Sequence, residues 1–560
     1  MNPNSLPSDY ILQSFNAFQD EIAQSPEKVL DYTNDVLRAP LTADQLQSLS
    51  ENSFRGEGSS FSSAEETSRD FAAKVGISGS YGFFSASAQA SYETKQIQTA
   101  TSYNYGYNAT LTMGATSFAQ ASNVQAIRQC LSTEMVSALD AISSVAAASD
   151  FTATYGTHLI LRVTQGGSLY ISIVATADSE SSEQTMSAEI KAAYSAAVSV
   201  SATASAMSKI ASKYQSSSLT QTVTASGGDP QMASQIDPNT PATFTGWTSS
   251  CTKDTVCAVA ETIEIMALAS GQAKVFLQTY IGMITLRQSI NNPSYFSKSA
   301  PVYPSVENKV EATVPAGYKI IAGGAAVTGP NNFLTQSCPS IDSHAVIEGW
   351  TAGCYDIDVN ANPATDILTA YAVAVYDPAN LLSVQVVQGS GSNPGSGPDK
   401  AAAQVTDILT GGGVSSRWQS NGPRYILGCF PSSDTEWSAA TRDYETPSSG
   451  VVLTVYAIGV SLAPLASANL TITSTIINQS AYRQEYGATT ASLSQVNVAS
   501  GGCNIEDATG WGNLLQCSKP STPTDWVVYQ KDTGGHSSQA NVTAYALGID
   551  AQFSDTRVQG

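Results

Sequence analysis

The part of the chain that follows residue 300 repeats one pattern three times, at about 310–385, 400–462 and 470–552. Each copy has a pair of glycines near β-branched residues, then a Cys/Pro/Ser segment, a tryptophan, an aspartate six residues later and a closing apolar strand. Short strands with Gly and Pro turns cannot bury a face alone, so the three copies must share one core. The pattern therefore predicts an all-β, pseudo-threefold domain of the β-prism or trefoil type.

The tryptophan and aspartate of each repeat admit two interpretations. In the first, a buried indole packs in the core and the aspartate fixes a turn. In the second, the three pairs are equivalent sites for a glycan or another receptor group, since an indole can stack on a sugar and a carboxylate can accept its hydroxyls. The six positions are Trp350, Asp356, Trp437, Asp443, Trp526 and Asp532.

The length and charge of the chain limit its organisation and its partners. At 560 residues it exceeds what one core usually serves, so at least two domains are expected. The change from Ser/Ala-rich sequence to short β-branched runs predicts domains at 1–300 and 305–560. Asp and Glu number 46 against 25 Lys and Arg, which gives a formal net charge of −21. This charge argues against a nucleic-acid partner and against docking on anionic lipid by charge alone.

The sequence has no run of about 20 apolar residues, which a transmembrane helix would need. Its first residues lack the basic and apolar regions of a Sec-type signal, so we expect a soluble product that acts outside its producer. Eight scattered cysteines and three histidines show no metal-type spacing, so neither a metal nor a cofactor is expected. Cys251 and Cys257 either close a short loop or stay reduced.

Apolar and mostly small polar residues alternate from residue 188 to residue 206. A strand with this pattern can place one face in lipid and the other in water, and its length exceeds the roughly 9 to 11 residues needed to cross a bilayer. The same stretch is rich in alanine and tolerates a helix. The apolar positions are Ala188, Ile190, Ala192, Tyr194, Ala196, Val198, Val200, Ala202, Ala204 and Ala206.

An earlier segment has the same alternation, with apolar residues at Ala86, Ala88, Ala90 and Tyr92. Both segments could be ordinary Ser/Ala surface helices. They could also be helical in one state of the protein and form membrane-inserting β-hairpins in another. Alternation alone does not separate these interpretations.

A short motif lies between the two alternating segments. Region 157–177 is typical of strand, turn, strand, with a pair of glycines at its centre. Paired glycines permit a sharp bend or the close approach of another backbone, although an ordinary hairpin turn would also use them. The motif residues are Tyr155, Gly156, Thr157, His158, Gly166 and Gly167.

This motif resembles the signature of the membrane-attack-complex/perforin (MACPF) family, with Leu159 in place of the usual aromatic residue. Further matches at Gly227-Gly228 and at 247–250 extend the resemblance over residues 10 to 295. The resemblance implies an α+β fold with a MACPF/CDC-like bent antiparallel sheet, flanked by helical clusters, and a sheet bend at Gly227 and Gly228. It also implies two hairpin clusters, at about 60–107 and 178–225.

The resemblance implies a pore-forming toxin. Domain 305–560 would bind a protein or glycan receptor on the target-cell membrane, the chain would form a ring-shaped homo-oligomer, and two hairpins per subunit would build a transmembrane β-barrel. The two-domain architecture resembles that of bacterial MACPF toxins with insecticidal activity. The alternative is a non-lytic MACPF adhesion protein. An enzyme is not expected, because His158 has no identifiable acid or nucleophile beside it and is interpreted as structural.

Overall fold

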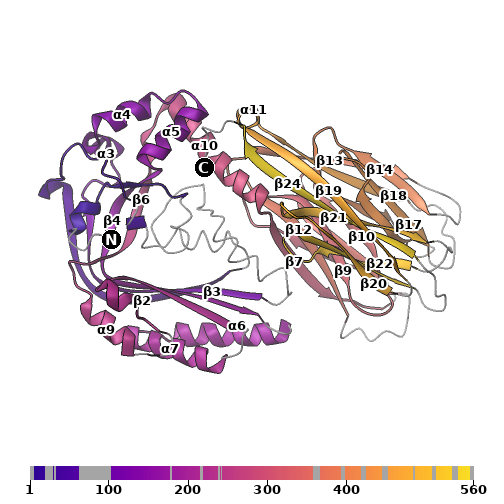
Figure 1. The fold of residues 1–560 in the computed structure, drawn as a ribbon, viewed down its shortest axis with the longest axis horizontal. Helices are drawn as coiled ribbons and strands as arrows, with labels where there is room; N and C mark the ends of the chain where they lie inside the picture. The colour runs from indigo at the N-terminus through magenta and orange to yellow at the C-terminus, as the bar shows by residue number, and fades with distance from the viewer. Residues whose placement is uncertain are drawn as a thin grey trace. The chain divides into compact units, whose positions relative to one another are not determined.

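The computed structural model describes residues 6–18, 29–30, 33–61, 102–176, 180–214, 219–237, 240, 242–304, 306–356, 366–391, 398–417, 424–443, 452–483, 486–507, 513–532 and 540–554. The chain divides into two compact units, residues 1–285 with 555–560 and residues 286–554 (Figure 1). The division lies inside helix α10 (Gly271–Asn291), earlier than the boundary predicted near residues 300–305. The cause is β7 (Ser294–Pro301), which pairs along its whole length with β12 of the second unit.

One six-stranded antiparallel sheet forms the centre of the first unit. Its order is β1-β4-β3-β2, and β5 and β6 also pair with β4. On one edge of β4, β6 pairs with residues 158–165 and β5 pairs with residues 167–175. The strands are β1 (Ser14–Phe15), β2 (Leu46–Phe61), β3 (Ser102–Phe118), β4 (His158–Thr176), β5 (Leu219–Gly227) and β6 (Val256–Glu264).

Because β4 is one continuous strand, the expected strand-turn-strand over 157–177 is wrong, and its central glycines are not a hairpin turn. The glycines sit instead where β4 changes partner from β6 to β5.

Helices and short 3-10 turns surround this sheet. Asn123, Ser132, Ser144 and Ser199 begin four of the helices by accepting a hydrogen bond from a backbone N–H three residues on. The elements are η1 (Pro7–Tyr10), η4 (Ala43–Gln45), α3 (Val124–Cys130), α4 (Thr133–Asp140), α5 (Val145–Tyr155), α6 (Glu180–Ser195), α7 (Val200–Lys213), α8 (Pro230–Ala233), α9 (Ala242–Ser250) and η5 (Ile265–Leu268).

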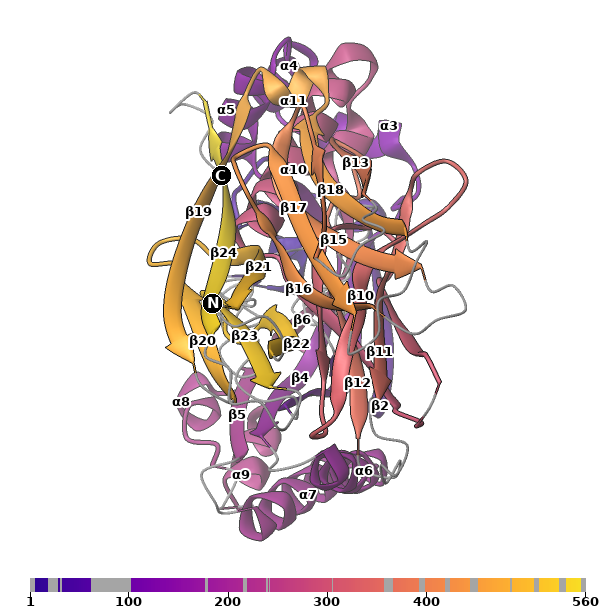
Figure 2. The same cartoon turned by 90° about the vertical axis from the view of Figure 1, so that its right-hand side faces the viewer.

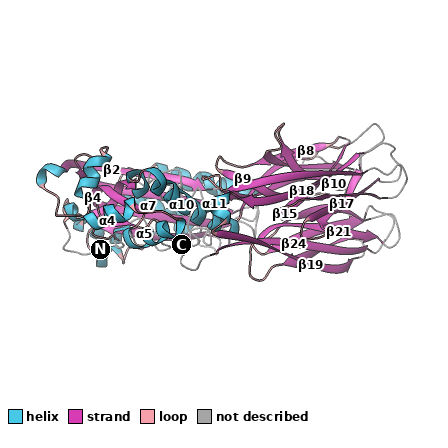
Figure 3. Cartoon of the chain, turned by 90° about the horizontal axis from the view of Figure 1, so that it is seen from above, coloured by secondary structure: helices cyan, strands magenta, loops and turns pink. Residues whose placement is uncertain are grey.

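The second unit consists of three six-stranded antiparallel sheets (Figure 3). Their orders are β13-β18-β15-β10-β11-β8, β20-β23-β22-β9-β12-β7 and β14-β17-β16-β21-β24-β19. The α+β class predicted from the sequence, with an all-β second part, is confirmed. Besides the end of α10, the only helix among its described residues is the short α11 (Pro464–Ser467).

Three groups of six consecutive strands correspond to the three repeats. The first contains β7, β8 (Asn308–Thr313), β9 (Tyr318–Val327), β10 (Asn332–Ile341), β11 (Ile347–Asp356) and β12 (Ile367–Tyr376). The second contains β13 (Leu382–Gly391), β14 (Asp399–Gln404), β15 (Ile408–Arg417), β16 (Arg424–Pro431), β17 (Glu436–Asp443) and β18 (Val452–Leu462). The third contains β19 (Leu470–Arg483), β20 (Tyr486–Ser492), β21 (Val498–Asp507), β22 (Asn513–Pro520), β23 (Asp525–Asp532) and β24 (Ala540–Phe553). The first two repeats therefore begin one strand earlier than predicted.

Each sheet combines strands from two repeats. A repeat gives its first, third and sixth strands to one sheet and its second, fourth and fifth strands to the next. The joins are short antiparallel pairings of β9 with β22, β15 with β10 and β21 with β16. No repeat can complete a sheet alone, so the three must fold together.

The repeated glycine pairs explain how the sheets come together. A Cβ on the first glycine of each pair (Gly323, Gly412 or Gly501) would collide with the tryptophan of the same repeat. A Cβ on the second glycine (Gly324, Gly413 or Gly502) would collide with the backbone of the neighbouring repeat. The tryptophan indoles are fully buried, and their Nε1 atoms donate to Ser337 Oγ at 3.1 Å, Cys429 Sγ at 3.1 Å and Ser518 Oγ at 2.9 Å.

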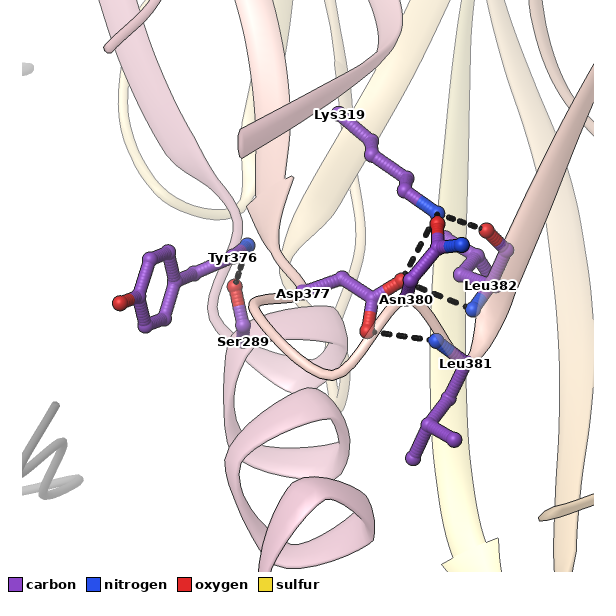
Figure 4. A network of polar contacts seen from close by, with 7 residues as sticks. All are labelled: Ser289, Lys319, Tyr376, Asp377, Asn380, Leu381 and Leu382. Atoms are coloured by element: carbon purple, nitrogen blue, oxygen red, sulfur yellow. Dashed lines mark hydrogen bonds and ion pairs between the residues drawn. The ribbon is translucent and has the colours of Figure 1, made fainter. Parts of the chain in front are cut away.

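A polar network fixes the turn between the first and second repeats (Figure 4). The buried Asp377 carboxylate accepts hydrogen bonds from the backbone N–H of Leu381 at 2.9 Å and of Leu382 at 2.8 Å, and it lies 2.9 Å from Lys319 Nζ. The backbone N–H of Tyr376 donates to Ser289 Oγ near the end of α10 at 2.6 Å. The buried charge is thus paired and hydrogen-bonded, as its burial requires.

Replacing Gly412 with alanine should lower the free energy of unfolding by about 1–3 kcal/mol, because the new methyl group overpacks against Trp437. Urea denaturation of the full chain, followed by tryptophan fluorescence, measures the change. The control is Gly246→Ala in α9, where a Cβ would meet no atom within 4 Å and helix propensity should make the change neutral or stabilising. Equal stability of the two variants would contradict the role assigned to the glycine pair.

Candidate functional site

Helices α6 and α7 cover the apolar face of the central sheet in the first unit (Figures 1 and 2). On β3 and β4 the buried residues are Tyr105, Tyr107, Ala109, Leu169, Ile171, Ile173 and Ala175. The two helices add Met186, Ile190, Tyr194, Ala204, Met207 and Ile210 to the same core. The helices and the sheet therefore share one hydrophobic core, and the sheet face would be exposed if the helices left it.

Tyr194 is the central contact between α6 and the sheet. Its ring centroid lies 4.9 Å from that of Tyr107 and 5.8 Å from that of Tyr105, and its hydroxyl donates to Gln221 Oε1 on β5 at 3.2 Å. Gly56 and Gly58 on β2 leave room for the two β3 phenols, because a Cβ at either position would collide with them. Nothing in the sequence pattern indicated this pairing of glycines with tyrosines.

Burial in α6 and α7 follows the helical period and not the two-residue period of the sequence. Met186, Ile190 and Tyr194, spaced by four residues, point to the sheet and are at most 5% exposed. Among the apolar positions of the alternating pattern, Ala188, Ala192 and Ala196 are exposed to solvent, and Val198 is 81% exposed. The helices thus bury only some of the apolar residues of the alternating pattern.

An ion pair joins the middle of α6 to the C-terminal end of α7. Lys213 Nζ lies 2.6 Å from a Glu189 carboxylate oxygen, and the Tyr214 hydroxyl donates to the same oxygen at 2.5 Å. Between the helices, small residues such as Ala192, Ala196 and Ala202 line a groove of 480 Å³. Side chains this small make few interlocking contacts, so the two helices are joined mainly at Glu189 and through the sheet.

Four glycines gather where β4 changes its partner strand. Gly167 on β4 lies opposite Gly227 on β5, and Gly166, Gly227 and Gly228 all have positive φ angles, of 128°, 77° and 64°. Trp247 from α9 packs on this cluster: a Cβ on Gly167 would lie 2.9 Å from its ring, and its Nε1 donates to Gly227 O at 2.9 Å. The backbone conformation and the seat for the indole both require glycine here.

The Tyr155–His158 segment attaches β1 to the base of β4. The Thr157 backbone N–H donates to Phe15 O at 2.9 Å, and Thr157 Oγ1 accepts from the Ala17 N–H at 2.9 Å. Gly156 has a φ of 76°, and a Cβ there would lie 2.6 Å from Phe15 O. The motif is structural in this state of the protein.

His158 is buried, stacks on Phe15 with a centroid distance of 5.5 Å, and places its Nδ1 2.9 Å from Thr157 Oγ1. Burial lowers the pKa of His158 to about 4, so the ring is neutral near neutral pH. Its cross-strand neighbour Glu264 has the opposite behaviour, since burial raises the pKa of that carboxyl to about 7, with Lys274 opposing the shift. No described side chain contacts His158 in the geometry of a catalytic triad.

The remaining predicted site residues fall into two groups. Ala86, Ala88, Ala90 and Tyr92, within the predicted cluster at 60–107, lie outside the described residues. The three repeat tryptophans are 0% exposed, so none can stack on a sugar, and this interpretation is wrong for them. Asp356 and Asp532 are buried at the ends of β11 and β23, opposite Asn332 and Asn513, and the Asp443 side chain lies outside the described residues.

In the described part of the chain, all eight cysteines are free and buried, including Cys251 and Cys257. None of the described helices has both the length and the apolar character that crossing a bilayer would require.

The fold and the site define a class: a sheet whose apolar face is covered by two helices, followed by a separate three-repeat β unit. Residues 13–280 match the family model of the MAC/Perforin domain, so this part of the chain belongs to the MACPF family. No curated protein matches the chain in sequence.

Three solved structures illustrate what the chain is similar to. GNIP1Aa from Chromobacterium piscinae is 16% identical, with 72% of this chain and 76% of that chain covered and a TM-score of 0.37. A putative cell invasion protein with a MAC/Perforin domain from Bacteriodes thetaiotaomicron is 12% identical, covering 54% and 65%, with a TM-score of 0.35. The cytotoxin suilysin from Streptococcus suis is 9% identical, covering 64% and 61%, with a TM-score of 0.20.

His158 at the base of β4 and its cross-strand neighbour Glu264 on β6 should give opposite pH dependences. Between pH 6.5 and 4 the unfolded chain binds a proton at His158 that the folded chain does not, so acidification should cost about 3 kcal/mol of stability. At Glu264 the folded chain binds the proton first, so acidification from pH 7 to 4.5 should stabilise the fold.

Urea unfolding of the full chain, followed by the helical circular-dichroism signal, tests both statements. The stability advantage of the wild type over His158→Asn should shrink on acidification, whereas its advantage over Glu264→Gln should grow. Parallel pH curves for the wild type and either variant would contradict the assignment for that residue.

Proposed function

We propose that this chain is a pore-forming toxin that assembles on a target-cell membrane as a ring and inserts two β-hairpins per subunit. The supporting observation is the mismatch in α6 and α7, where a sequence with two-residue alternation is folded with helical burial. Only an extended strand places all ten apolar positions of 188–206 on one face. The helices would then be the storage form of a membrane-crossing hairpin.

The strand pairing next to these helices supports the same proposal. β4 leads into α6 and β5 follows α7, and the two strands pair antiparallel up to Ala175 and Leu219. If this register continued without a bulge, Ala188 would oppose Ala206 and Ala192 would oppose Ala202, with the hairpin tip at residues 196–198. Opposed residues share a face, so the continued register would assemble one apolar face from both strands.

The need for a closed ring follows from backbone hydrogen bonding in the membrane. In lipid every backbone N–H and C=O needs a partner, so inserted hairpins must pair between subunits until no edge is left. β2 and β3 likewise flank residues 62–101 in the sequence, and the strands that lead into and out of the two predicted hairpin clusters are neighbours in the antiparallel order β2-β3-β4-β5. In this proposal the second unit captures a receptor on the target cell, and insect cells are the first target to examine.

A lysine on the proposed lipid face should strongly reduce pore formation without unfolding the protein. Ala192 is exposed in α6, so Ala192→Lys should leave stability unchanged, but it would place a charge near the bilayer midplane at a cost of about 2–4 kcal/mol per hairpin. Dye release from insect midgut membrane vesicles should fall at least tenfold. The control is Ser195→Lys, which is also exposed in α6 but falls on the lumen face. Equal dye release by the two variants would contradict the proposed hairpin.

Environment-sensitive labels should report the two-residue period directly. All eight native cysteines are buried, so single cysteines at the exposed positions Ala188, Ala192 and Ala196, or at Lys191 and Ser195, can be labelled selectively. After permeabilisation, labels at the even positions should report an apolar environment, and labels at the odd positions an aqueous one. Aqueous signals at all five positions in leaky vesicles would sink the insertion model.

The alternative, a non-lytic adhesion protein, predicts another result with the same material. The wild type would then bind receptor-bearing vesicles and retain the dye, and its labels would keep the emission of the soluble state.

A further inference from the structure

A groove of 640 Å³ lies on the outer face of the sheet β20-β23-β22-β9 in the second unit. It is formed by the end of β9 and by outward-facing residues of β20, β22 and β23. Of the described residues that line it, none is acidic, and two are lysines. The main side chains are those of Tyr486, Gln516, Lys519, Val527, Tyr529 and Lys531.

The two lysines are held in place without a carboxylate. Lys519 Nζ donates to the Tyr371 hydroxyl at 3.3 Å and lies 5.2 Å from the centre of that ring. Lys531 Nζ donates to Pro330 O at 2.6 Å. The ion pairs formed among the described residues include neither lysine. In a chain of net charge −21, two cations without acidic partners in one concave site favour an anionic ligand.

Two tyrosines lie beside these cations. Tyr486 is 64% exposed and lies directly opposite Lys531 in the β20–β23 ladder, and Tyr529 is on the same face of β23 two residues before Lys531. A largely exposed aromatic ring in a ligand groove can stack on the C–H face of a pyranose, and its hydroxyl adds a hydrogen-bonding group. The site therefore combines ring stacking with anion recognition.

The internal symmetry sets these residues apart from the pattern that the three repeats share. Counted from each repeat tryptophan, Tyr529 corresponds to Gly353 and Ala440, and Lys531 corresponds to Tyr355 and Arg442. Relative to the proline opposite each tryptophan, Lys519 corresponds to Cys338 and Phe430. The inward-facing tryptophan is the same in all three repeats, whereas this pair of lysines with a tyrosine occurs at one of the three positions.

We propose that this groove binds an acidic sugar, a pyranose that carries a carboxylate or a sulfate, at the end of a cell-surface glycan. Lys519 and Lys531 would bind the anionic group, and Tyr486 and Tyr529 would pack on the ring. A multiply phosphorylated lipid headgroup fits less well, because the groove has only two cations and the protein as a whole repels anionic membranes. The biological role as receptor capture rests on the proposed pore-forming function, but the binding itself does not.

Isothermal titration calorimetry on the full chain tests the site with three probes: 3′-sialyllactose, lactose 3′-sulfate and uncharged lactose. We expect binding of one or both acidic sugars, at least about tenfold tighter than lactose, since a charged hydrogen bond contributes this much. Tyr486→Ala and Lys531→Gln should each weaken binding by about tenfold. Tyr482→Ala on β19, 60% exposed, and Lys400→Gln on the exposed face of β14 are the matched controls and should bind as the wild type does.

The proposal is overturned if neither acidic sugar binds better than lactose, or if the groove variants and the controls bind equally. Binding of inositol 1,4,5-trisphosphate in preference to both sugars would also overturn it, in favour of a lipid headgroup. Because calorimetry needs no membrane, a chain that binds the sugar but releases no dye would leave this site intact and count against pore formation alone.

Discussion

The packing of α6 and α7 on the central sheet is the constraint on which the first unit depends. β3 and β4 present a continuous apolar face, and in water that face must be covered. The cover is made by helices of Ser/Ala-rich sequence, which are weakly stable in isolation and are held by tertiary contacts such as Tyr194 between Tyr105 and Tyr107. Moving the two helices away would therefore expose apolar side chains of both the helices and the sheet to water. This unfavourable free energy is offset only where another apolar environment takes up the exposed residues.

Gly166 and Gly167 divide β4 into two parts with different partner strands. Below Gly166, the strand is paired with β6 and attached to β1 through Thr157 and Phe15. Above Gly167, it is paired with β5 and covered by α6 and α7. Trp247 sits on the glycines between these parts, and its hydrogen bond to Gly227 O joins this point of the sheet to α9.

Several features of the fold followed directly from the sequence because they arise from local periodicity. The three repeats, the all-β character of the second unit and the Ala-rich region 188–206 are all visible as spacings. Features that depend on contacts between distant residues were not visible: the exchange of strands between repeats, the fit of Gly412 against Trp437, and the ion pair of Glu189 with Lys213. The role of Gly166 and Gly167 was also not visible in the sequence, because a hairpin turn and a change of partner strand can both use paired glycines.

The second unit separates residues that maintain the fold from residues that are free to differ. The inward-facing tryptophan of each repeat packs on a glycine of the same repeat, and the next glycine packs on the backbone of the neighbouring repeat. A change at any of these positions therefore disturbs two sheets at once. At the groove, Tyr486, Lys519, Tyr529 and Lys531 are all at least partly exposed, and the last three differ from their counterparts in the other two repeats. The tryptophan and the glycine pair of the core are the same in the three repeats, whereas these groove residues differ. Such a unit can therefore keep its core while one face acquires a binding specificity. The groove at Lys519 and Lys531 is lined by side chains that differ between the repeats, so the unit can carry a single recognition site there.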